Sequence, residues 1–227
     1  MDDILMHQRH RNVLLVEGEA DRGFFEALCR LSGVSADVRV ATPRDVGGSH
    51  NTKEGVLSHL TSVLLPQLQD GQLARIGVVI DADRAENGGG FAATLRRFTD
   101  ALEQGDYQPD PAPAAGLVFT HPDGLADLGL WIMPNNLDEG MLEDWIKQCV
   151  NPSESGLYQH AEKSIDAIPG APKFQPWHRS KAEVATWLAW QKKPGHGLYN
   201  AAQTDLINVE APLFKALQAW LRHVFAA

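Results

Sequence analysis

The chain has 227 residues, of which 44% are hydrophobic, and it carries a formal net charge of -9 with a pI near 5.4. This length and apolar content are enough for one large α/β domain or for a domain with a helical appendage, and we expect the second. The negative charge argues against nucleic-acid binding by bulk electrostatics, because that mode depends on clustered lysines and arginines. Any contact with DNA or RNA is therefore expected to be local, through a metal ion, a few basic residues or a partner protein.

Cysteine and histidine usage gives no sign of a zinc site or a disulfide framework. Cys29 and Cys149 fall in predicted helices and form no CxxC or Cys/His pattern, and the nine histidines are scattered. No apolar run approaches the ~18 residues that span a bilayer, and the first residues lack the apolar segment of a signal peptide. We therefore expect a reduced, cytoplasmic protein without membrane contact.

Strands and helices alternate in the first half of the chain. Short apolar runs predict strands over residues 12–16, 37–41, 76–80 and 117–120. Apolar residues at helical spacing predict helices over residues 20–31, 53–68 and 91–103, the first of them ended by Gly33. This βαβαβαβ order predicts a central parallel sheet with right-handed crossovers, flanked by helices.

The second half of the chain is predicted to be mainly helical. Residues 129–133 allow one more strand, and helices are expected over residues 139–150, 181–191 and 212–225. We place a soft boundary near Asn151. An α/β domain over residues 1–150 would then carry a helical extension, residues 151–227, packed on it.

Two acidic clusters, each at the end of an apolar run, carry most of the functional signal. The first, in VEGEAD, holds Glu17 and Asp21, and the second, in VVIDADR, holds Asp81 and Asp83. Because parallel strands end at the same edge of a sheet, we expect these four side chains to lie close together. Four carboxylates repel one another unless a cation neutralises them, so the expected cofactor is Mg²⁺ or Mn²⁺.

The spacing within each cluster indicates how its carboxylates would face the ion. Asp21 lies one helical turn after Glu17, so both can face one ion if a helix starts between them. Asp81 and Asp83 point to one side if the strand stays extended through them. Taken singly, each acid also fits an ordinary negative charge at a helix N-terminus.

Basic and polar residues near the clusters fit phosphate contacts. Arg84 directly follows the second cluster and carries a guanidinium suited to a phosphate oxygen. Four residues at the start of the second predicted helix could meet a phosphate there: Ser49, Asn51, Thr52 and Lys53. A flexible loop and a helix cap explain these four equally well.

The motifs VEGEAD and VVIDADR resemble the two signature elements of the Toprim domain, the topoisomerase-primase fold. The Glu-Gly-x-x-Asp form, together with GLWIMPNNLDEGMLEDWI, is most similar to small standalone Toprim proteins related to OLD-family nucleases. The resemblance covers residues 13–146. It implies a Toprim-like, Rossmann-like sheet and divalent-metal phosphodiester chemistry on DNA or RNA, within a defence or repair assembly.

The resemblance also implies roles for individual residues. Glu17 matches the invariant Toprim glutamate, a metal ligand or general acid/base, and Asp81 and Asp83 match the Mg²⁺-binding pair. Asp21 matches an additional acid of OLD-like members. These four residues would form the first metal site.

Two further residues complete the site that the resemblance implies. A second metal ion requires another carboxylate, for which Glu143 in MLEDWI is the candidate and Asp144 is less suitable. OLD-type nucleases also use a downstream basic residue, and Lys181 would take that role as a transition-state stabiliser. An ordinary position on a helix explains Glu143 equally well.

Other functions stay open, because the chain lacks the ATPase that OLD nucleases carry and contains no GxxxxGK[ST] phosphate loop. A small phosphoester hydrolase is one alternative, since acidic pairs on parallel sheets also serve phosphatases. A noncatalytic Toprim-like interaction module is another, favoured by the acidic charge and by the tryptophans of the last helices. A protein partner or a second copy of the chain fits each of these functions.

Overall fold

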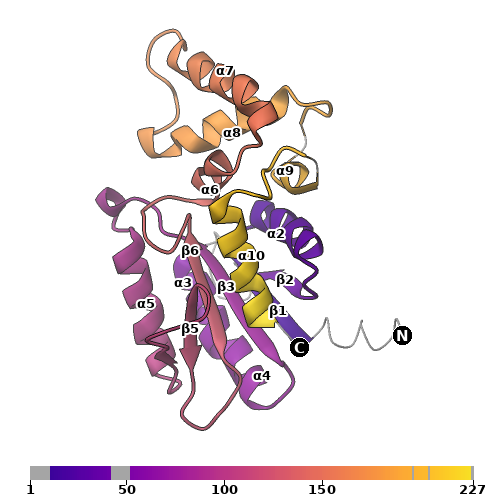
Figure 1. Ribbon diagram of the computed structural model, residues 1–227. Coiled ribbons are helices and arrows are strands. Elements are labelled where there is room, and N and C mark those ends of the chain that lie inside the picture. Colours follow the sequence, from indigo (N-terminus) through magenta and orange to yellow (C-terminus); the bar gives the residue numbers. More distant parts are fainter. Residues whose placement is uncertain (1–10, 42–51, 196, 204, 226–227) are drawn as a thin grey trace.

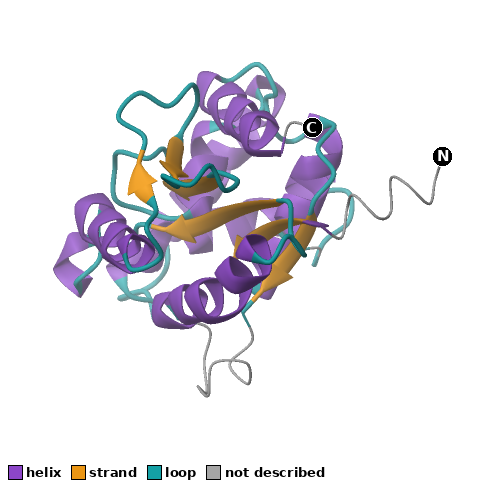
Figure 2. Cartoon of the chain, turned by 90° about the horizontal axis from the view of Figure 1, so that it is seen from below, coloured by secondary structure: helices purple, strands orange, loops and turns teal. Residues whose placement is uncertain are grey.

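The computed structural model describes residues 11–41, 52–195, 197–203 and 205–225. In it a six-stranded sheet of order β2-β1-β3-β6-β5-β4 has helices on both faces (Figures 1 and 2). The predicted α/β class and the helix-flanked sheet are therefore confirmed. Ser49 and Asn51, two of the residues expected to contact phosphate, lie outside the described residues.

The sheet is parallel in its centre and antiparallel at one edge. Its parallel strands are β1 (Asn12–Val16), β2 (Asp37–Val40), β3 (Arg75–Asp81) and β6 (Leu128–Met133). The two others, β5 (Leu117–Thr120) and β4 (Gln108–Pro109), run antiparallel to their neighbours, so the expectation that residues 117–120 extend the parallel sheet was wrong. Residues 121–127 alone connect β5 to β6, too few for the helical crossover that a parallel neighbour requires.

Helices form two layers on the sheet and a third group at its end (Figure 1). One face is covered by α2 (Glu19–Ser32) and α10 (Pro212–Phe225). The other is covered by α3 (Lys53–His59), a π-helical turn (Leu60–Leu64), α4 (Leu65–Gln69) and α5 (Phe91–Glu103). Beyond the carboxyl ends of the parallel strands lie α6 (Leu142–Gln148), α7 (Ser155–Asp166), α8 (Arg179–Ala189) and α9 (Tyr199–Gln203).

Short 3₁₀ turns complete the secondary structure at Ala85–Asn87, Pro152–Glu154 and Pro176–His178. The sequence did not predict α7 or α9. No helix in the described part of the chain combines the length and the apolar character needed to cross a bilayer.

Residues of β1 alternate between two hydrophobic cores. Val13 and Leu15 pack in the core beneath α3, α4 and α5, whereas Leu14 and Val16 pack in the core beneath α2 and α10. All four side chains are fully buried. A strand covered on both faces reads as a continuous apolar run, which is why β1 was predictable.

The C-terminal helix α10 packs directly on two glycines of the sheet. Gly77 of β3 and Gly129 of β6 are register partners. A Cβ atom at Gly129 would lie 2.3 Å from a methyl of Val224, and one at Gly77 would lie 3.0 Å from the Phe225 ring. The close approach of α10 therefore depends on two positions without side chains. The boundary expected near Asn151 stays a prediction.

We expect Gly129→Ala to lower the free energy of unfolding by about 1–3 kcal/mol, because the added methyl would overlap Val224. The matched control is Gly156→Ala in α7, where a Cβ would meet nothing within 4 Å. The control should be neutral or stabilising by up to about 1 kcal/mol, since alanine favours helix more than glycine does. Urea unfolding followed by circular dichroism measures both, and equal stability of Gly129→Ala and wild type would contradict this packing.

Candidate functional site

The two acidic motifs meet at the carboxyl edge of neighbouring strands. β1 and β3 pair in parallel, Glu17 directly follows β1, and Asp81 is the last residue of β3. Asp21 lies in the first turn of α2, the helix that begins after Glu17 and Gly18. Glu17, Asp21 and Asp81 line a cavity of about 10 Å³, which is close to the size of one water molecule. Three of the four acids expected together at the strand ends therefore line one small cavity, and Asp83 is not among them.

Glu17 has a buried carboxylate oxygen, Oε2, with no hydrogen-bond partner among the described residues. Burial raises the pKa of this carboxyl from its usual 4.5 to about 7, and the charges of Asp83 and Asp21 add to the rise. The Lys53 ammonium and the backbone amide of Asp81 act in the opposite direction. A buried, unpartnered oxygen among acids is unfavourable unless a proton or a cation compensates it.

Asp81 is fixed by the start of α6 and surrounded by acids. The backbone amide of Leu142 donates a hydrogen bond to its Oδ1 over 3.0 Å. Burial raises the pKa of the Asp81 carboxyl well above its ordinary range, and four neighbouring carboxylates add to the rise: Glu17, Asp21, Glu143 and Asp83. Asp81 therefore occupies the centre of the acidic cluster.

Asp83 leaves the strand instead of continuing it. Its φ is +60°, and its backbone exchanges hydrogen bonds of 2.8 and 3.1 Å with Gly140. A positive φ is costly outside glycine, and the pairing with Gly140 holds it here. Its carboxylate Oδ2 lies 2.7 Å from Nζ of Lys53. The extended backbone that would point Asp81 and Asp83 to one side is not formed.

Lys53 is a buried cation within the acidic cluster, with 8% of its surface exposed. Besides pairing with Asp83, its ammonium donates a hydrogen bond of 2.9 Å to the carbonyl of Ala82. The preceding residue, Thr52, caps α3 by accepting a bond of 3.1 Å from the Gly55 amide. The sequence indicated Lys53 only as a phosphate contact. Lys53 begins α3, the helix that follows β2, and β2 lies beside β1; this order of elements was the signal that could have put it at this edge.

Helices α6 and α8 bring Glu143 and Lys181 toward the same edge. Burial raises the pKa of Glu143, the Lys181 ammonium lowers it, and Asp21 adds to the rise. Burial lowers the pKa of Lys181, but nearby carboxylates, led by Glu143 and Asp81, make the net shift upward. Lys181 is exposed and forms no ion pair in the part of the chain that the structure describes. It is thus an available positive charge beside the acids.

Arg84 and Asp144 have other partners. The Arg84 guanidinium lies 3.1 Å from the Glu139 carboxylate, which also accepts a bond of 2.8 Å from the Ala85 amide. Asp144 accepts a hydrogen bond from the Ser180 hydroxyl and so joins α6 to α8. Arg84 thus forms a surface ion pair outside the acidic cluster, and Asp144 has a structural role.

The donor set of the cluster fits a hard divalent cation, although its side chains are not arranged as a preformed metal cage. As placed, no three His, Cys, Asp or Glu side chains among the described residues approach one point closely enough to hold a metal ion. The donors are all carboxylate oxygens, and one of them, Oε2 of Glu17, is buried and unpartnered. Oxygen donors of this kind suit Mg²⁺ or Mn²⁺. Glu17, Asp21, Asp81 and Asp83 are the residues that would hold such an ion.

Comparison with known proteins gives one match. A family model described as "Protein of unknown function (DUF3226)" matches residues 11–226. The chain belongs to the DUF3226 family. Every residue of the acidic cluster, together with Lys53 and Lys181, lies inside the DUF3226 match. No curated protein and no solved structure matches the chain.

Proposed function

We propose that this DUF3226 chain is a divalent-metal-dependent, Toprim-type phosphodiesterase that cleaves nucleic acid. The observation that carries the proposal is the buried, unpartnered Oε2 of Glu17 beside Asp81 and Asp83. Carboxylates gathered at strand ends recruit a divalent cation when their charges cannot be relieved in another way. The resemblance of VEGEAD and VVIDADR to the Toprim motifs supports the same chemistry.

Each residue has a role that follows from its surroundings. Hydrolysis joins a water oxygen to phosphorus and breaks one P–O bond, so charge must be stabilised on the phosphoryl oxygens and on the leaving oxygen. A bound Mg²⁺ or Mn²⁺ supplies Lewis-acid stabilisation of that charge. Lys181, exposed beside the acids, would add a positive charge at the phosphate. Lys53 holds the carboxylate of Asp83 in place.

DNA or RNA is the proposed substrate, bound locally through the acidic site and nearby basic residues. The net charge of -9 argues against a broad basic surface on this chain, so a protein partner or a second copy would supply further contacts with the nucleic acid. We propose a cytoplasmic location. Cys149 supports it, because it is a buried thiol that forms no disulfide and a reducing compartment keeps thiols in this state.

A noncatalytic module is the second candidate, and one observation favours it. The Lys53 ammonium lies 2.7 Å from Asp83 and already supplies part of the positive charge that the cluster needs. A protein that used the cluster only for structure would require no more than this. Binding of a metal without any hydrolysis would then be the expected behaviour.

A cleavage assay tests the proposal. The full chain is incubated with plasmid DNA, single-stranded DNA and RNA in Mg²⁺, in Mn²⁺ and in EDTA. We expect cleavage of at least one polymer with metal and none in EDTA. Equal cleavage in EDTA would refute the metal dependence. Phosphate release from nucleotides with intact polymers would identify a small phosphoester hydrolase, and no hydrolysis under any condition would favour the noncatalytic module.

A further inference from the structure

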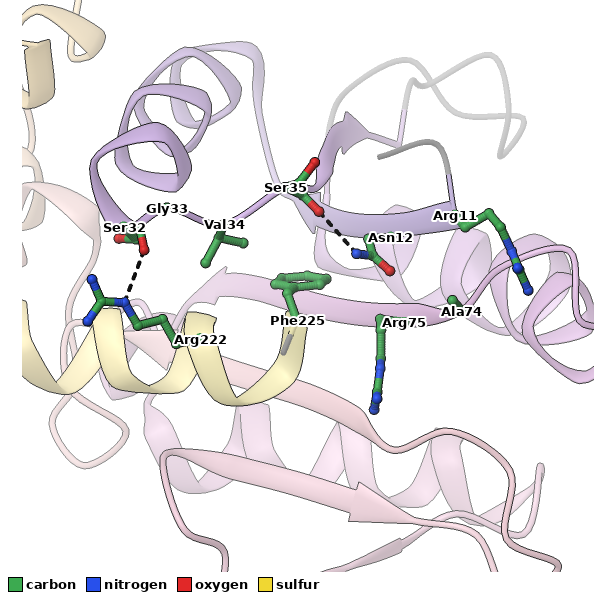
Figure 3. A pocket seen from close by; sticks show the side chains of 10 residues that line it. All are labelled: Arg11, Asn12, Ser32, Gly33, Val34, Ser35, Ala74, Arg75, Arg222 and Phe225. Atoms are coloured by element: carbon green, nitrogen blue, oxygen red, sulfur yellow. Dashed lines mark hydrogen bonds between the residues drawn. The ribbon is translucent and has the colours of Figure 1, made fainter. Parts of the chain in front are cut away.

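A pocket of about 690 Å³ opens at the edge of the sheet opposite to the acidic cluster (Figure 3). It lies where β1 and β3 begin, between the end of α2 and the end of α10. The acids follow the other ends of the same two strands. β3 is seven residues long, so roughly 20 Å separates the pocket from the acidic cluster. The two features therefore cannot share one small ligand.

Among the residues that the structure describes, three arginines and no acidic residue line this pocket: Arg11, Arg75 and Arg222. Such a concentration of positive charge stands out in a chain with a formal charge of -9. Arg11 and Arg222 each donate one hydrogen bond of 3.0 Å to a backbone carbonyl, those of Gly71 and Ser32. A guanidinium has five N–H donors, so both arginines keep donors for a ligand.

Arg75 is the arginine most available to a ligand. It is the first residue of β3 and is partly buried. Its guanidinium forms no hydrogen bond or ion pair with any residue that the structure describes. The strand fixes the position of Arg75, so its guanidinium can donate hydrogen bonds to an oxyanion such as a phosphate.

The pocket also has an apolar wall formed by Phe225 and Val34. Figure 3 shows the Phe225 ring between Arg222 and Arg75. The volume of about 690 Å³ falls within the range typical of small-molecule sites and exceeds the space that a bare phosphate fills. A ligand that matches both walls carries an anionic group and a ring.

We propose that this pocket binds a small phosphorylated molecule with a ring, of the size of a nucleoside monophosphate. Its phosphate would accept hydrogen bonds from Arg75, and its ring would pack against Phe225 and Val34. Arg11 and Arg222, which lie toward opposite ends of the pocket in Figure 3, would add positive charge around the ligand. The proposal stands independently of the proposed cleavage activity, because it involves none of the acidic residues and requires no metal.

Calorimetric titration of the full chain in EDTA tests the proposal. The probes are the four ribonucleoside monophosphates, the matching nucleosides and inorganic phosphate. At least one monophosphate should bind at least about tenfold more tightly than inorganic phosphate, and the nucleosides should not bind detectably. Equal affinity for inorganic phosphate and the monophosphates would overturn the proposal, as would the absence of binding by all probes.

Substitutions assign the binding to the pocket. Arg75→Ala should weaken the binding of the monophosphate at least about tenfold. The affinity of Arg75→Lys should lie between those of wild type and Arg75→Ala, since an ammonium keeps the charge but not the planar arrangement of donors. The matched control is Arg96→Ala, which removes an exposed arginine of α5 outside the pocket. The control should bind like wild type. Equal losses in Arg75→Ala and Arg96→Ala would mean that general charge attracts the anion, and would overturn the proposal.

Discussion

Asp81→Asn is expected to lower the rate of metal-dependent cleavage at least about 100-fold. Four other carboxylates surround Asp81, and two of them, Glu17 and Asp21, belong to the other motif. Asparagine has nearly the same shape, and its oxygen can still accept the hydrogen bond from the Leu142 amide, so the fold should be kept. What disappears is the negative charge that a divalent cation needs. Initial rates on the cleaved polymer, at saturating Mg²⁺, measure the effect.

The matched control for this variant is Glu103→Gln. Glu103 is exposed at the end of α5, so the substitution removes one negative charge far from the cluster. Its cleavage rate should equal that of wild type. If Asp81→Asn cleaved nearly as fast as Glu103→Gln, Asp81 would have no part in the chemistry, and the proposed assignment would fail.

Glu17→Gln is expected to stabilise the metal-free fold by up to about 3 kcal/mol at pH 8. The pKa of Glu17 rises from 4.5 to about 7 on folding, so the folded chain holds this proton more tightly than the unfolded chain. Wild-type stability therefore falls as the pH rises from 4.5 to 7, and the full cost is present above pH 7. Glutamine carries no charge and escapes this cost.

Urea unfolding in EDTA at several pH values measures this difference. The advantage of Glu17→Gln over wild type should be near zero at pH 4 and largest at pH 8, whereas Glu103→Gln should show no comparable trend. Mg²⁺ should stabilise wild type more than Glu17→Gln, because the ion compensates the carboxylate. A Glu17→Gln variant less stable than wild type at pH 8 would mean that the carboxylate has a favourable partner, contrary to the structure.

The central strands of the fold were predictable because strands buried on both faces consist of consecutive apolar residues. β1 and β3 are covered on both faces and read as apolar runs, and parallel pairing places Glu17 and Asp81 at one edge. The direction of β5 was not predictable from its composition. It depends on the short connection over residues 121–127, which allows no crossover helix.

Side-chain partners within the site were harder to predict, because they depend on segments far away in sequence. The backbone of Asp83 turns because it pairs with Gly140, which lies in a separate loop. Arg84 contacts Glu139, 55 residues further along the chain, and no local sequence pattern predicts this pair. The residue types in the sequence thus indicated where the acidic side chains lie together, whereas the loops determine which charged groups pair with one another.

Titration of Mn²⁺ into the metal-free chain, followed by the electron paramagnetic resonance signal of the free ion, shows whether carboxylates from two distant motifs, Glu17 with Asp81 and Asp83, bind a divalent cation. We expect saturable binding by wild type and by Glu103→Gln, and at least about tenfold weaker binding by Asp81→Asn. Equal affinity in all three proteins, or no binding by wild type, would contradict a cation site formed by these residues.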